Sequence, residues 1–75
     1  MDIESRLRKL ESRYRGALSA AVAAKSHYLA LDGEASATPA AIARAHDQWQ
    51  QLESLKKLIA QRMDEVERLE HEAMG

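Results

Sequence analysis

One stretch decides the fold of this chain: Asp32-Gly33-Glu34-Ala35-Ser36-Ala37-Thr38-Pro39. Gly33 can adopt the left-handed conformation that often ends a helix. Thr38 followed by Pro39 is typical of a helix start, with Thr38 as the N-cap and Pro39, the only proline, as the first helical residue. The sequence therefore predicts a turn at residues 33–38 between two helices, at about residues 2–32 and about residues 39–74.

Both predicted helices carry a seam, an apolar stripe with the 3.5-residue spacing of a left-handed coiled coil. In the first helix the seam comprises Ile3, Leu7, Leu10, Tyr14, Ala17, Ala21, Ala24, Tyr28 and Leu31. In the second it comprises Ile42, Ala45, Trp49, Leu52, Lys56, Ile59, Met63, Val66, Glu70 and Ala73. Because both predicted segments are helical, the predicted fold class is all-α. The short connection makes the two helices antiparallel neighbours. We expect an antiparallel two-helix hairpin, like a coiled coil, that forms one domain over residues 1–75.

The predicted register pairs large side chains with small ones across the seam. Folding about the turn places Trp49 opposite Ala24 and Leu52 opposite Ala21. Such alternation allows helices to pack at the density of a protein interior. We therefore expect Trp49 to pack in the seam.

Charged residues are distributed unevenly along the chain, although its net charge is only -1. Residues 1–16 hold five basic and three acidic side chains, whereas residues 61–75 hold two basic and five acidic ones. The hairpin would lay these ends side by side, so we expect the acidic end to neutralise the basic end. Helical spacing also predicts four ion pairs between residues four apart: Glu4–Arg8, Glu11–Arg15, Glu53–Lys57 and Asp64–Arg68.

The sequence points away from catalysis and from bound cofactors. It has no cysteine, no Gly-rich phosphate loop and no serine with a base at helical spacing. His27 and His46 fall on opposite flanks of the predicted seam, so we expect solvated histidines rather than a metal site. We predict no catalytic residues, no cofactor, no metal and no small-molecule substrate. No uncharged run approaches the roughly 20 residues that span a bilayer, so we expect a cytoplasmic protein without a membrane partner.

A two-helix core of this size seldom provides more than about 3 to 5 kcal/mol of stability without a metal, a disulfide or a partner. Apolar residues outside the seam show where a partner would bind: Leu18, Val22, Leu29, Leu55, Leu58 and Leu69. We expect these residues to form a protein interface. Self-association into a dimer, and so a four-helix bundle, is the first interpretation. Binding to a different protein, or a monomer in which these residues merely widen the seam, are the alternatives.

An alternative function involves the basic part of the first helix: Arg6, Arg8, Lys9, Arg13 and Arg15. These side chains would contact phosphates in a dimeric RNA-binding hairpin. The acidic end of the second helix and the lack of any nearby aromatic residue except Tyr14 argue against this function. Nucleic acid is therefore the less favoured partner.

The length, the single turn at residues 33–38 and the heptad seam resemble two groups of small helical hairpins. One comprises plasmid-encoded RNA-binding hairpins that dimerise into four-helix bundles, and the other comprises co-chaperones of type III secretion systems. Phage-encoded inhibitors of host regulators also look like this. The resemblance implies a small regulatory protein, and we expect a non-enzymatic adaptor, co-chaperone or inhibitor.

Overall fold

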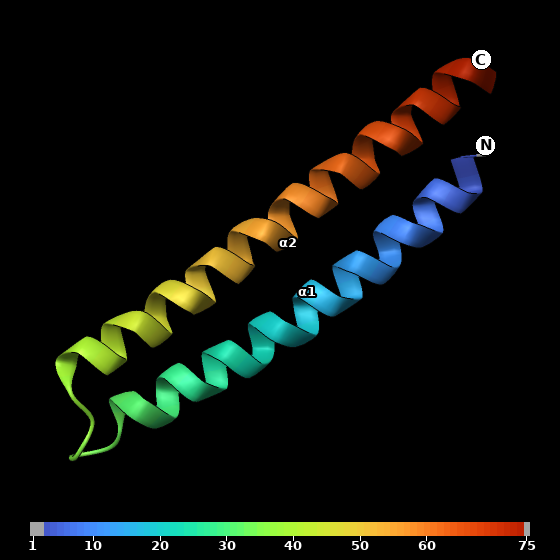
Figure 1. Ribbon diagram of the computed structural model, residues 1–75. Helices are drawn as coiled ribbons and strands as arrows, with labels where there is room; N and C mark the ends of the chain where they lie inside the picture. Colours follow the sequence, from blue (N-terminus) through green and yellow to red (C-terminus); the bar gives the residue numbers. More distant parts are fainter. Residues whose placement is uncertain (1–2, 75) are drawn as a thin grey trace.

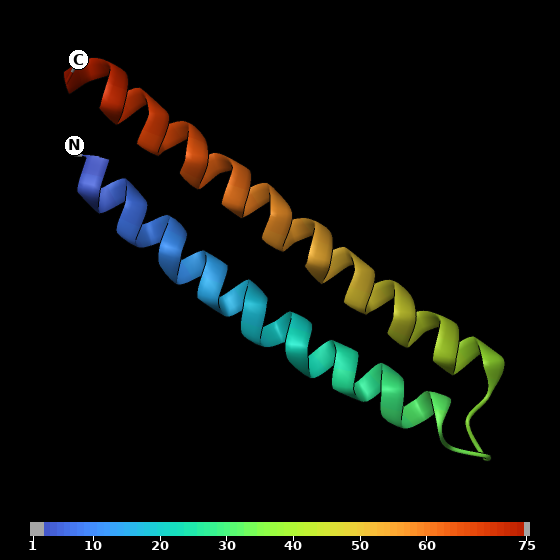
Figure 2. The same cartoon turned by 180° about the vertical axis from the view of Figure 1, so that it is seen from behind.

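The computed structural model describes residues 3–74, which form two helices and no strand. Helix α1 spans Ile3–Asp32 and helix α2 spans Pro39–Met74. The two helices run antiparallel, so that the start of α1 and the end of α2 lie at the same end of a rod of 58 × 15 × 15 Å (Figures 1 and 2). The predicted hairpin is confirmed, and only the expected start at residue 2 lies outside the described residues.

The start of α2 is capped as the sequence predicts. The Thr38 hydroxyl oxygen accepts a hydrogen bond from the Ala41 amide at 3.2 Å. The Thr38 carbonyl accepts another from the Ile42 amide at 3.1 Å. The side chain therefore satisfies one of the amides that a helix start leaves without a partner.

The predicted left-handed conformation of Gly33 is wrong. No residue that the structure describes has a positive φ angle, and the Gly33 amide still donates to the Leu29 carbonyl at 3.2 Å as in an α-helix. The next amide, that of Glu34, donates to Leu31 at 3.1 Å, three residues back. A tighter final turn thus ends α1, without the conformation that only glycine adopts easily.

The hairpin buries mainly small side chains. Its buried apolar residues are Ala17, Ala21, Ala24, Ala45 and Val66. Larger seam side chains are half-buried: Leu7, Leu10, Tyr14, Tyr28, Leu31, Ile42, Trp49, Leu52, Ile59 and Met63. The predicted seam is thereby confirmed where side chains are described, except that Ala73 at its end is exposed. The side chain of Ile3, the first predicted seam residue, lies outside the described part of the chain. Because the alanines let the helices approach closely, the large side chains are only partly covered.

The ion pairs of residues 3–74 join neighbours on the same helix. Of the four predicted pairs, only Glu4–Arg8 forms, at 3.8 Å, and Glu53 instead contacts Lys56, three residues away, at 3.0 Å. No ion pair in this part of the chain connects the basic end of α1 to the acidic end of α2. At the level of side-chain contacts the expected neutralisation across the hairpin is therefore wrong, because the ion pairs of the described residues join side chains three or four residues apart on the same helix.

Candidate interaction surfaces

Six large apolar side chains of the described chain are exposed, and they are the six that the sequence predicts for an interface. Leu18, Val22 and Leu29 form what we call the α1 face, with exposed fractions of 39%, 59% and 55%. The α2 face has exposed fractions of 46%, 62% and 60%, and comprises Leu55, Leu58 and Leu69. The hairpin thus buries four alanines in its interior, while these six aliphatic side chains remain in contact with solvent.

The two faces lie on opposite flanks of the hairpin. Leu18 follows the seam residue Ala17, whereas Leu55 precedes the seam residue Lys56. In an antiparallel pair, the residues that directly follow a seam residue lie on the same flank in both helices, and those that directly precede one lie on the other flank. Leu18 and Leu55 therefore point to different sides. A partner on one face therefore leaves the other face accessible.

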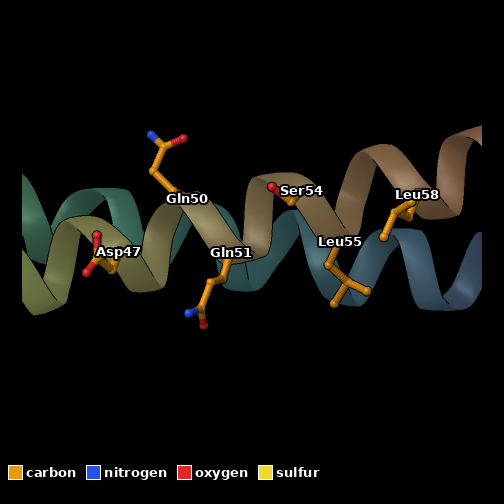
Figure 3. A pocket seen from close by; sticks show the side chains of 6 residues that line it. All are labelled: Asp47, Gln50, Gln51, Ser54, Leu55 and Leu58. Carbon is orange, nitrogen blue, oxygen red and sulfur yellow. The ribbon is translucent and has the colours of Figure 1, made fainter.

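A shallow hollow lies at the end of the α2 face nearer the turn, beside Leu55 and Leu58 (Figure 3). It is lined by α2 alone, through Asp47, Gln50, Gln51, Ser54, Leu55 and Leu58. Figure 3 shows the Leu55 and Gln51 side chains extending from the same side of α2, with Gln50 on the other side. A hollow formed by one helix is open to solvent along its length, which suits a docked helix better than an enclosed small molecule.

Three rings pack together near the turn. Tyr28 stacks on Trp49 with ring centroids 5.7 Å apart, and His46 meets Tyr28 edge-on at 5.1 Å and Trp49 at 5.7 Å. The Trp49 indole N–H donates to Glu53 at 3.3 Å, and the Lys25 ammonium lies 5.6 Å from the indole ring centroid.

His46 is therefore half-buried, and the expectation of a solvated side chain is wrong for this histidine. Tyr28 on the facing helix covers the imidazole ring, and sequence spacing within α2 alone does not reveal this contact. His27 is exposed, as expected.

A cationic groove lies between the helices near the termini. Its lining comprises Arg6, Lys9, Leu10, Arg13, Arg62 and Val66. Three of the five basic residues predicted to contact nucleic acid thus come together here, joined by Arg62 from α2. The Arg62 guanidinium donates to Glu65 at 3.0 Å, whereas Arg6, Lys9 and Arg13 have no ion-pair partner among residues 3–74.

The other two predicted nucleic-acid contacts do not belong to this groove. Arg8 pairs with Glu4 on exposed surface, and both Arg8 and Arg15 follow a seam residue, which places them on the flank of the α1 face. Arg62, which the sequence analysis missed, precedes the seam residue Met63 as Arg13 precedes Tyr14. Comparing positions before the seam on both helices would have found it.

Among the residues that the structure describes, Glu53 is the one carboxyl group whose pKa shifts clearly. Its hydrogen bond to Lys56 lowers the pKa of the Glu53 carboxyl, and the positive charge of Lys56 and the Trp49 indole N–H act in the same direction. Partial desolvation opposes these effects. Glu53 therefore remains ionised and joins Trp49 to Lys56 on one side of α2.

Within residues 3–74, no three histidine or acidic side chains come together as a metal site would require. No helix in the described part of the chain has an apolar stretch long enough to cross a membrane. The described surface does bring together the apolar side chains of the two faces and the cations of the groove.

No protein-family model, curated protein or solved structure matches the chain.

Proposed function

We propose that this protein is a non-enzymatic interaction module that docks helices on its exposed apolar faces. The observation that carries the proposal is the inverted distribution of apolar side chains. Four alanines and a valine are buried, while five leucines and a valine are exposed. Monomeric proteins rarely leave such groups unpartnered in rows along a helix, and docked helices bury them best.

The first occupant that we propose is a second copy of the chain. Two hairpins that pair flank to flank make a four-helix bundle, in which the half-buried seam side chains and one apolar face of each copy become interior. A core of alanines removes little apolar area from water, so the free energy of unfolding of the isolated hairpin is small. Burial of further apolar side chains in a dimer would add to it. An adaptor, co-chaperone or inhibitor acting in the cytoplasm would use the remaining face to bind its target.

Light scattering coupled to size exclusion tests this proposal directly. We expect the wild-type chain to elute with the mass of a dimer, and the double variant Leu18→Ser/Leu55→Ser to shift toward the monomer mass while keeping part of its helicity. Ala30→Ser, at an exposed position outside both faces, is the matched control and should retain the wild-type mass. A wild type that is monomeric at high micromolar concentration and still melts cooperatively would refute self-association.

A further inference from the structure

The cationic groove combines a charged rim with an apolar floor. Leu10 and Val66 line it together with the four cations, and Val66 is only 6% exposed. Glu65 neutralises Arg62 at 3.0 Å, which leaves three positive charges of α1 without a partner among the described residues. A ligand for this groove must therefore supply negative charge and also tolerate contact with apolar groups.

The groove is continuous with the α2 face. Leu58, Arg62, Glu65 and Leu69 follow one another at steps of four, three and four residues, so they form a single stripe along α2. The leucines at its two ends are 62% and 60% exposed. At 1.5 Å per residue the stripe is about 16 Å long, or about three helical turns. Its dimensions and its parallel course along the hairpin fit a third helix.

A second copy of the chain is a poor occupant of this flank. A two-fold axis through the groove would bring the same patch of both copies together, so the cations of one groove would face the same cations of the other. Like charges at an interface are repulsive and disfavour that pairing. The flank of the α1 face carries Arg8 and Arg15 instead of this groove, and Arg8 is paired with Glu4, so a second copy can dock there with less repulsion.

Nucleic acid is also disfavoured, because no aromatic side chain lines the groove to stack on a base. We infer that the cationic groove and the adjoining leucines dock an acidic amphipathic helix of a different protein. Its carboxylates pair with Arg6, Lys9 and Arg13, and its apolar side chains cover Leu58 and Leu69. This inference rests on the proposed function, since it names the partner of the α2 face.

Fluorescence anisotropy of the full chain with a designed probe tests the inference. The probe is a fluorescein-labelled amphipathic peptide of about five helical turns, with Leu at every third or fourth position and Glu between them. The comparison peptide has Gln in place of Glu. We expect the Glu peptide to bind at low salt, to bind more weakly as salt rises, and to bind more tightly than the Gln peptide.

Two double variants with the same change in charge locate the binding site. Lys9→Gln/Arg13→Gln alters the groove, whereas Arg8→Gln/Arg15→Gln alters the opposite flank. Because an exposed ion pair contributes a factor of about two to five, we expect the groove variant to weaken binding by about tenfold. The matched control should lie close to the wild type.

Three results would overturn the inference: no binding of the Glu peptide at low salt, equal losses in both double variants, or tighter binding of labelled single-stranded RNA that displaces the peptide. Dimer mass distinguishes failure of this inference from failure of the proposed function. If the groove variants fail to affect peptide binding but Leu18→Ser/Leu55→Ser still lowers the mass, only the acidic partner is refuted. If the charge variants behave as expected while the wild type is monomeric, only self-association is refuted.

Discussion

Tyr28 on α1 and Trp49 on α2 stack across the hairpin, with ring centroids 5.7 Å apart and ring planes inclined by 21°. The predicted register places Trp49 opposite Ala24. The same folding about the turn sets Tyr28 opposite Ala45, and both alanines are buried. Small residues opposite the two rings leave room for them, and the rings stack on each other between the helices. This contact joins the helices at the end of the rod nearest the turn.

We predict that the Tyr28–Trp49 stack stabilises the hairpin beyond the area it buries. In a double-mutant cycle of Tyr28→Leu and Trp49→Leu, the coupling energy should be about 0.5 to 1.5 kcal/mol. Urea unfolding followed by circular dichroism measures it. A cycle of Tyr14→Leu and Trp49→Leu is the control and should be additive within about 0.5 kcal/mol. Additivity in the first cycle would contradict the stack.

We predict that the alanine interior does not tolerate larger side chains. Ala21 is 1% exposed, and the Leu of Ala21→Leu would push the helices apart and lower the free energy of unfolding by about 1 to 3 kcal/mol. Ala23→Leu, two residues away but exposed, should change the stability little. Equal effects of the two substitutions on chemical denaturation curves would mean that the seam is assigned to the wrong face of α1.

We predict that Gly33 can be replaced by alanine. A Cβ atom there would lie 3.6 Å from the Leu29 carbonyl oxygen, an ordinary contact, and the φ angle is not positive. Gly33→Ala should therefore leave the stability unchanged or raise it by up to about 1 kcal/mol. Gly16→Ala, whose added Cβ would meet nothing within 4 Å, should stabilise α1 by about 0.5 to 1 kcal/mol. If Gly33→Ala clearly lowers the thermal stability while Gly16→Ala does not, Gly33 does adopt the left-handed conformation and the prediction is wrong.

We predict a loss of stability in acid that depends on Glu53. Because Lys56 lowers the pKa of the Glu53 carboxyl in the folded chain, the ionised form stabilises the fold. This contribution is present above the ordinary pKa of a glutamate and disappears as pH falls through the lowered pKa, in the range below about pH 4.5. Urea unfolding across that range should show a weaker pH dependence in Glu53→Gln. Lys56→Met should have the same effect, and an unchanged pH dependence in both variants would exclude the pair.

Much of the candidate surface could be predicted from the sequence, because exposure on a helix follows from spacing relative to the seam. Leu18 follows a seam residue and Leu55 precedes one, and both are exposed as that spacing requires. The composition of the cationic groove could not be predicted in this way. Arg13 and Arg62 are distant in sequence, and they share a groove only because the antiparallel register brings two separate helical stripes together.

The sequence by itself determined the turn at residues 33–38, the N-cap at Thr38, the seam and the exposed leucines. These features depend on local conformational preferences and on the helical repeat, which are written in short stretches of chain. The tertiary structure alone decided that His46 packs against Tyr28, that Arg62 joins the cations of α1 and that no ion pair of the described residues connects the two helices. Those contacts depend on the rotation and lateral offset of one helix relative to the other, where a shift of one residue turns a side chain by about 100°.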